Sequence, residues 1–117
     1  MSQETPKLGL PVIMPAQAQK HITHNAALEL LDLAVQLTLE SDAASTAPTS
    51  PMEGQSWAVP AGATGVWSGQ GGKIASWRGG GWLFVVPQDG WLAWCKNDTA
   101  LKVRNAGAWQ VLATPAI

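Results

Sequence analysis

The spacing of hydrophobic and polar residues divides the chain into an N-terminal segment, a helix and a series of short strands. Residues 1–15 contain Pro6, Pro11 and Pro15 among apolar residues, and prolines at this spacing prevent a helix and favour extended backbone. Apolar residues then recur three, four and seven positions apart, as on one face of a helix: Ala27, Leu30, Leu31 and Ala34. We therefore predict an extended arm followed by a helix over residues 16–33, with the clearest pattern at residues 25–34.

From Leu33 to Glu40 the hydrophobic period changes to two, which is typical of a half-buried strand. The switch from helix to strand falls between residues 32 and 36. Residues 41–54 are small and polar and contain two prolines, so we predict a linker loop there. The rest of the chain predicts short strands separated by turns: 55–60, 64–68, 73–78, 81–87, 91–96, 100–104 and 108–113.

The tryptophans indicate an internal repeat. A shift of 27 residues superimposes Trp67 on Trp94 and Trp82 on Trp109, although only five of the 27 positions are identical. We therefore predict two copies of one small β unit, residues 57–83 and 84–110. The predicted fold class is α+β: an extended N-terminal arm and one helix, followed by a small antiparallel all-β module of two ~27-residue repeats.

These elements predict three consecutive parts. Residues 1–40 (arm, helix and first strand) serve attachment or oligomerisation, residues 41–54 form the linker loop, and residues 55–117 form the Trp-rich β module. Charged residues make up only 13% of the chain, against ~25% in a typical soluble protein. Few polar residues are available to cover the surface, which favours either burial in an assembly or an aromatic face presented to a ligand.

Charge and composition exclude several classes of function. The net charge is −1 and the seven Lys and Arg residues are scattered, whereas a nucleic-acid-binding protein shows a basic patch or stripe. No apolar run approaches the ~20 residues of a membrane span, and residues 1–6 lack the apolar core of a signal peptide. We expect synthesis in the cytoplasm, no nucleic-acid partner and no membrane insertion. The single Cys95 is expected to be a small buried side chain within a strand.

The candidates for catalytic or metal chemistry are weak. His21 and His24 share a helical face, but no Cys is nearby and the next carboxylates are more than a turn away. The glycine-rich residues 62–73 fail the phosphate-loop pattern, because Trp67 replaces a required Gly and Ile74 replaces Ser or Thr. Catalytic carboxylates would have to come from a set that nothing in the sequence pairs: Glu40, Asp42, Glu53, Asp89 and Asp98. We therefore predict no enzyme, no catalytic residue, no metal and no cofactor.

The tryptophans are the best candidates for a binding role, because indole rings can stack on the faces of sugars. Trp is highly buried on average, so the Trp residues that match between the predicted repeats are expected in the core: Trp67, Trp82, Trp94 and Trp109. Trp77 and Trp91 have no matching Trp in the other copy. They are our candidates for exposure and for contact with a glycan.

Several stretches together resemble one family. They are residues 8–28, with the run Pro15-Ala-Gln-Ala-Gln-Lys-His21, and residues 31–37, 51–60, 63–69, 72–77, 81–84 and 87–91. Over most of its length the chain is similar to a domain-of-unknown-function family that occurs in tail fibre and head spike proteins of alphaproteobacterial phages, prophages and gene transfer agents. The resemblance implies a virion component near the attachment machinery, and it implies no catalytic residue.

We predict a fibre or spike domain that attaches the host-adhesion appendage to the particle and is located in the virion. Fibres and spikes are commonly threefold, and a short helix gains from burying its apolar face against copies of itself. We therefore expect a homotrimer with residues 16–34 at the contact, and other virion proteins of head or tail as further partners. The candidate oligomer or docking contacts are apolar: Leu10, Ile13, Ile22, Ala27, Leu30 and Leu31. The alternative is a glycan-binding module for host capsule or lipopolysaccharide, and a glycan hydrolase is a remote third hypothesis.

Overall fold

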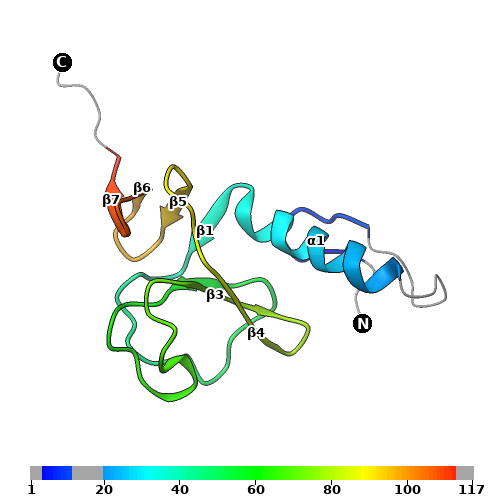
Figure 1. The fold of residues 1–117 in the computed structure, drawn as a ribbon, viewed down its shortest axis with the longest axis horizontal. Helices are drawn as coiled ribbons and strands as arrows, with labels where there is room; N and C mark the ends of the chain where they lie inside the picture. Colours follow the sequence, from blue (N-terminus) through cyan, green and yellow to red (C-terminus); the bar gives the residue numbers. More distant parts are fainter. Residues whose placement is uncertain (1–3, 12–19, 113–117) are drawn as a thin grey trace.

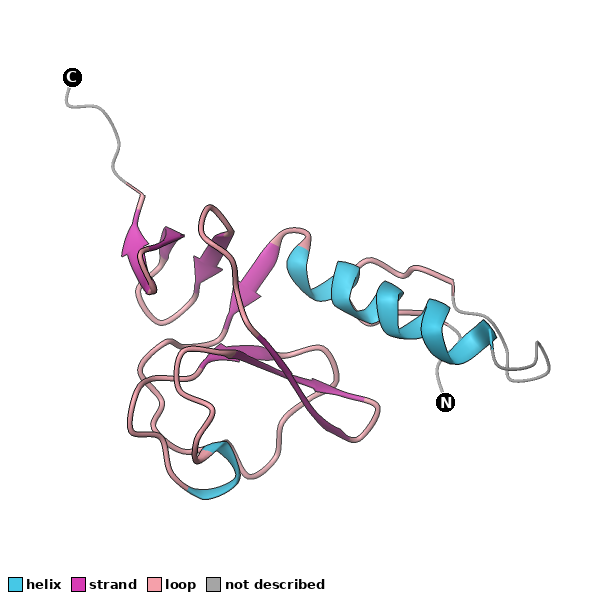
Figure 2. Ribbon diagram, in the orientation of Figure 1, coloured by secondary structure: helices cyan, strands magenta, loops and turns pink. Residues whose placement is uncertain are grey.

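The described part of the protein has one helix beside two small sheets. A computed structural model describes residues 4–11 and 20–112, with the backbone alone for residues 20–24. Within these residues the elements are α1 (Lys20–Ala34), β1 (Leu37–Leu39), β2 (Ser56–Ala58), the 3₁₀ turn η1 (Gly65–Trp67), β3 (Ile74–Arg78), β4 (Gly81–Val85), β5 (Leu92–Cys95), β6 (Ala100–Asn105) and β7 (Ala108–Val111). One sheet has the order β1-β5-β6-β7 and the other the order β2-β3-β4. Figures 1 and 2 show the two sheets next to each other, with α1 extending to one side.

Helix α1 follows from its residue types. Residues 20–34 are rich in Ala and Leu and contain no Gly or Pro, which suits a helix interior. Gln36 then adopts a φ of 53°, a left-handed conformation that ends the helix and turns the chain into β1. The predicted helix is confirmed over residues 20–33, and residues 16–19 lie outside the described residues. The helix is too short and too polar to cross a membrane, and no helix in the described part of the chain can do so.

The predicted fold class, α+β with an antiparallel all-β module, is wrong. The described part of the chain is mostly β, with seven strands in two sheets and a single helix. Strand β1 lies parallel to β5, with Leu37 opposite Ala93 and Leu39 opposite Cys95. The whole three-stranded sheet is inserted in the chain between β1 and β5, and this long connection is what permits a parallel pair. Sequence periodicity indicates where a strand lies but not which strand it pairs with, so it could not reveal this parallel pair.

The two predicted repeats are not folding units. Strand β4 crosses the boundary that the sequence placed between residues 83 and 84. The 27-residue shift also superimposes Trp57 of β2 on Phe84 of β4, and Trp67 of η1 on Trp94 of β5. These pairs occupy different places in different elements, so the units 57–83 and 84–110 have no structural basis.

What the shift does relate is the pair of hairpins β3–β4 and β6–β7. In each, two residues with positive φ connect the strands: Gly79 (61°) and Gly80 (79°) in the first, Ala106 (53°) and Gly107 (79°) in the second. Two left-handed central residues are the signature of the type I′ turn, whose twist matches that of the flanking strands. The shared Gly and Trp positions therefore reflect one common turn geometry.

Residues 4–11 fold back on themselves, so the prediction of an extended arm is wrong over this stretch. The Thr5 N–H donates to the Leu10 carbonyl (2.9 Å), and the Gly9 N–H donates to the Thr5 carbonyl (3.1 Å). Gly9 has a φ of 67°, and this conformation reverses the chain. A residue with a side chain would be strained at this φ, whereas Gly is not. The other residues of the predicted arm, 1–3 and 12–15, lie outside the described residues.

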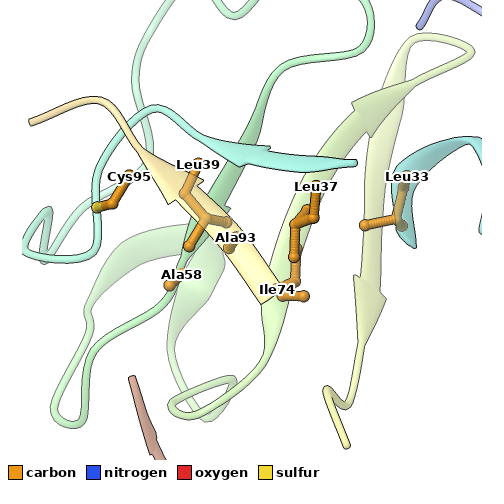
Figure 3. Packing of buried hydrophobic residues seen from close by; sticks show 7 residues of the cluster. All are labelled: Leu33, Leu37, Leu39, Ala58, Ile74, Ala93 and Cys95. Carbon is orange, nitrogen blue, oxygen red and sulfur yellow. The ribbon is translucent and has the colours of Figure 1, made fainter. Parts of the chain in front are cut away.

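The main core lies where the two sheets and the C-terminal end of α1 meet (Figure 3). Its buried hydrophobic side chains come from α1 and from both sheets: Leu33, Leu37, Leu39, Ala58, Ile74, Ala93 and Cys95. Leu37 and Leu39 point into it from β1, as the period-two pattern predicted. The prediction for Cys95 is confirmed, since its side chain is fully buried within β5. Each sheet therefore covers the inner face of the other, and strands of three to six residues become stable together.

Candidate functional site

Four tryptophans gather on the three-stranded sheet. Trp57, Trp67 and Trp82 have ring centroids between 5.3 and 6.1 Å apart, and Trp77 lies 5.0 Å from Trp82. Trp67 is fully buried and Trp57 nearly so, whereas Trp77 and Trp82 are half-buried. Edge-to-face packing of this kind makes a second core. The expected core position of Trp67 is confirmed, but η1 replaces the strand predicted at residues 64–68.

Trp77 also borders an open pocket of about 360 Å³. Trp77, Trp82 and Val66 line one part of it, and the loop before β2 lines the rest. The residues of this lining with polar side-chain groups are Thr46 and Thr49, which carry hydroxyls, and Trp77 and Trp82, which carry indole N–H groups. A small hollow with an aromatic wall and few polar groups is typical of sites for small ligands. The pocket therefore keeps Trp77 as a candidate contact for a sugar ring.

The tryptophans of the four-stranded sheet have different environments. Trp91 and Trp109 are half-buried and pack against the main core, and the Arg104 guanidinium lies 5.5 Å from the centre of the Trp109 ring. Trp94 is 42% exposed, so its predicted core position is wrong. Side chains of β5 alternate between the two faces of the sheet, so Ala93 is buried and Trp94 points outward. Of the two candidate glycan contacts, Trp77 borders a pocket and Trp91 supports the core.

The apolar face predicted for the helix points away from the rest of the molecule. Leu30 and Leu31 are 44% and 48% exposed, and Ala27 is exposed as well. Leu10, in the folded-back N-terminal stretch, is half-buried. The remaining predicted contacts, Ile13 and the side chain of Ile22, lie outside the described residues. The structure thus brings three of the six candidates to one exposed helical face.

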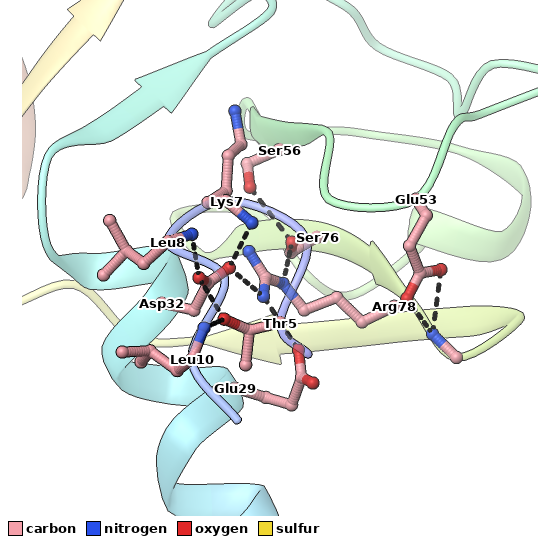
Figure 4. A network of polar contacts seen from close by, with 11 residues as sticks. Thr5, Lys7, Leu8, Leu10, Glu29, Asp32, Glu53, Ser56, Ser76 and Arg78 are labelled. Carbon is pink, nitrogen blue, oxygen red and sulfur yellow. Dashed lines mark hydrogen bonds and ion pairs between the residues drawn. The ribbon is translucent and has the colours of Figure 1, made fainter. Parts of the chain in front are cut away.

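The opposite face of α1 holds a buried charge network (Figure 4). One oxygen of Asp32 accepts from the Thr5 hydroxyl (2.6 Å) and the Leu8 N–H (2.5 Å). The other accepts from the Lys7 N–H (3.0 Å) and Arg78 Nη1 (2.7 Å). Burial by itself would raise the pKa of Asp32, but these donors outweigh it, and the pKa is lowered. Asp32 is therefore a charged side chain that holds residues 5–8 against the helix.

Arg78 completes this network from β3. Its Nη1 also contacts Glu29 (2.8 Å), and its Nε donates to the Ser76 hydroxyl (2.8 Å), which in turn accepts from the Ser56 hydroxyl (3.0 Å). The N-terminal stretch, α1 and the three-stranded sheet are thereby tied together. The sequence analysis placed Arg78 at the end of a strand and missed this role. The available signal was a pair of acids three residues apart, Glu29 and Asp32, among the leucines of the predicted helix.

A second charged group lies beside the four-stranded sheet. The Lys102 ammonium donates to Asp42 (2.6 Å) and to Asp98, and the Cys95 thiol donates to Asn97 (2.7 Å). Burial alone would lower the pKa of Lys102, but the two carboxylates outweigh it and raise that pKa. Burial raises the pKa of Cys95, so its thiol stays protonated.

Two of the five carboxylates considered for catalysis therefore meet, with a lysine between them. Asp42, Cys95 and Asp98 could each offer one ligand atom, and these atoms lie within 4.8 Å of one another. The Lys102 ammonium already supplies the positive charge there, so the geometry is that of a partly buried salt bridge. His21 and His24, the other candidate ligands, have side chains outside the described residues.

Comparison with known proteins places the chain in a family. A family model described as a protein of unknown function, DUF2793, matches residues 24–110. The matched region contains most of α1, the strands β1 to β6 and all but the last residue of β7. No curated protein matches the chain.

Proposed function

The chain belongs to the DUF2793 family, and from this premise we propose that it is a virion structural protein. In this proposal it is a fibre or spike domain of a phage or gene transfer agent, and it attaches the host-adhesion appendage to the particle. Its partners are copies of itself, as a homotrimer, and other virion proteins of head or tail.

The observation that carries the proposal is the apolar face of α1. Leu30 and Leu31 face outward while Glu29 and Asp32 of the same helix face Arg78 inside the molecule. A surface helix of an isolated domain normally shows the reverse arrangement. A helix that turns Glu29 and Asp32 inward and leaves Leu30 and Leu31 exposed is suited to packing against other proteins.

The proposal is tested by asking whether the protein travels with particles. Particles released by the bacterium that encodes the chain are purified on a density gradient, and the chain is quantified by mass spectrometry across the fractions. We expect the chain to peak with the capsid proteins at a fixed ratio. A chain that stays in the particle-free fractions contradicts the proposal.

The second candidate is a module that binds host capsule or lipopolysaccharide, and the pocket beside Trp77 supports it. Titration of the protein with such polysaccharide, followed by tryptophan fluorescence, is the direct test. A saturable shift that Trp77→Ala abolishes favours this candidate. Trp94→Ala is the matched control, because it removes an exposed Trp that does not line this pocket. Absence of any shift in the wild-type protein removes the basis of the glycan hypothesis.

A further inference from the structure

In the described part of the chain three cationic residues are buried, and one of them has no acid beside it. Arg78 and Lys102 each form ion pairs with two carboxylates. Among the residues that the structure describes, no carboxylate forms an ion pair with the third, Arg104, although this residue is only 9% exposed. A buried charge is normally paired, because its removal from water is costly. Arg104 therefore carries a positive charge for which the described residues supply no counterion.

Arg104 is fixed in place one residue before the end of β6. Its N–H donates to the Trp91 carbonyl (2.9 Å), and its carbonyl accepts from the Gly90 N–H (2.7 Å). Nη2 of its guanidinium donates to the Gly72 carbonyl (3.2 Å), and the guanidinium lies over the Trp109 ring. A guanidinium has five N–H donors, and within the described residues this carbonyl is its one hydrogen-bond acceptor. The side chain is therefore held in one position with most of its donors left over.

Arg104 lines a hollow of about 270 Å³ where the two sheets meet. Arg104 and Trp109 come from β6 and β7 of one sheet, and residues 58–61 belong to the end of β2 in the other sheet and to the loop after it. Much of the remaining lining is small: Ala58, Ala61, Gly72, Gly107 and Ala108. The volume lies just below the range of about 300–1,000 Å³ that is usual for ligand pockets. The hollow therefore fits one small group, about the size of a single ring.

The charges around the hollow favour an anion with one negative charge. Asp42 is the one acid of the lining, and its oxygens already accept from Lys102 (2.6 Å) and Asn97 (3.4 Å). Lys102 therefore balances Asp42, and the charge of Arg104 remains. One carboxylate neutralises that charge, whereas a doubly charged phosphate adds a surplus negative charge near Asp42. A carboxylate also matches the planar guanidinium, because two parallel N–H···O bonds can join them.

We propose that this hollow binds a small carboxylic acid of about one ring in size, and that the ligand class is the hexuronates. The carboxylate of the ligand accepts hydrogen bonds from the Arg104 guanidinium, and the half-buried Trp109 ring offers an apolar surface to the ring of the ligand. The site shares no lining residue with the pocket beside Trp77. It is independent of the virion role and of the self-association proposed above.

The test is a titration of the isotope-labelled full chain with D-glucuronate, followed by amide chemical shifts. D-glucose is the matched ligand without a carboxylate. Arg104→Gln removes the charge, and Ala108→Glu places a carboxylate of the protein in the lining, where it competes with the ligand. Ala108 is exposed, so this second variant keeps the test decisive if Arg104→Gln does not fold. Ala26→Glu is the matched control, because Ala26 is exposed on α1 and does not line the hollow.

We expect the amides of Gly72 and Gly107 to shift saturably with glucuronate, with a dissociation constant on the order of 1 mM, and not to shift with glucose. Arg104→Gln and Ala108→Glu should each raise this constant at least ~10-fold, because each removes charge-assisted hydrogen bonds to the ligand. Ala26→Glu should leave it unchanged. Glucose binding as tight as that of glucuronate overturns the proposal, as do shifts that survive both variants of the hollow and the absence of any shift.

Two further ligands test the chemical class. N-acetyl-glutamate amide carries the carboxylate of an acidic protein side chain without a ring, and inorganic phosphate carries more charge. We expect both to bind more weakly than glucuronate, because the first does not cover Trp109 and the second brings surplus charge next to Asp42. Tighter binding of the glutamate probe overturns the hexuronate in favour of an acidic protein segment. Tighter binding of phosphate overturns the choice of a carboxylate.

Discussion

Replacing Asp32 by Asn should loosen the N-terminal stretch and destabilise the whole fold. The Asp32 carboxylate accepts four hydrogen bonds, two on each oxygen, from Thr5, Lys7, Leu8 and Arg78. Asn has the same shape but only one acceptor oxygen, and its NH₂ group must face two donors whichever way it is turned. The substitution therefore removes the negative charge and takes away the acceptor that Asp32 offers to two of its four donors.

The expected loss of stability follows from burial of the pair. Asp32 is 1% exposed and Arg78 is 8% exposed, so Asp32→Asn leaves a buried guanidinium without its closest counterion. Removing one partner of a buried ion pair costs about 3–5 kcal/mol. Glu29 still contacts Arg78, so we expect the lower end, about 3 kcal/mol, which corresponds to a fall in Tm on the order of 10 °C.

Urea unfolding of Asp32→Asn, followed by tryptophan fluorescence, measures this loss. Amide hydrogen exchange measures the local effect, since the Lys7 and Leu8 amides should lose protection. Asp89→Asn is the control, because Asp89 is an exposed carboxylate in a turn. The reasoning is refuted if Asp32→Asn is within ~0.5 kcal/mol of wild type and its Lys7 and Leu8 amides stay protected.

Three further predictions concern other parts of the fold. Ala106→Asn should raise the unfolding free energy by about 1 kcal/mol, because Asn tolerates the left-handed φ of 53° better than Ala, and chemical denaturation measures the gain. Trp67→Ala should cost about 3–5 kcal/mol and leave the protein largely unfolded at 37 °C by circular dichroism, since Trp67 is fully buried against two other Trp rings. Folding lowers the pKa values of Asp32 and Asp42. The two ionised carboxylates therefore stabilise the fold fully above their unfolded pKa of ~3.9, and this stabilisation is lost as the pH falls through their lower folded pKa values. Tm should therefore fall steeply below about pH 4, and Asp32→Asn should flatten that fall; an equally steep fall in the variant would contradict the assignment.

The helix and most strands could be predicted because their signals are local. The i, i+3, i+4 spacing around Leu30 and the alternation from Leu37 to Leu39 depend on a few neighbouring residues. The hairpin turns at residues 79–80 and 106–107 were likewise visible as Gly-containing breaks between apolar runs. The glycan contact at Trp77 stays a prediction, although the side chain borders a pocket, whereas the exposure of Trp94 was not foreseen.

The parallel pairing and the charge networks could not be predicted because they join distant residues. Asp32 meets Arg78, 46 residues away, and Asp42 meets Lys102, 60 residues away. No periodicity records which acid will meet which base. Without those partners, Lys102 and Arg104 would be expected to face water and Trp94 the core, which is the reverse of what the structure has. The predicted repeat was wrong for a related reason: the sequence matched Trp67 with Trp94, and these two residues lie in different kinds of element.

The central claim, that this domain attaches an appendage to a particle, is tested most directly by electron microscopy of particles from a strain that lacks the gene. The account predicts intact capsids without the fibre or spike, and restoration of the appendage by the wild-type gene but not by one encoding Leu30→Glu and Leu31→Glu. Particles that carry normal appendages in the absence of the protein would contradict it.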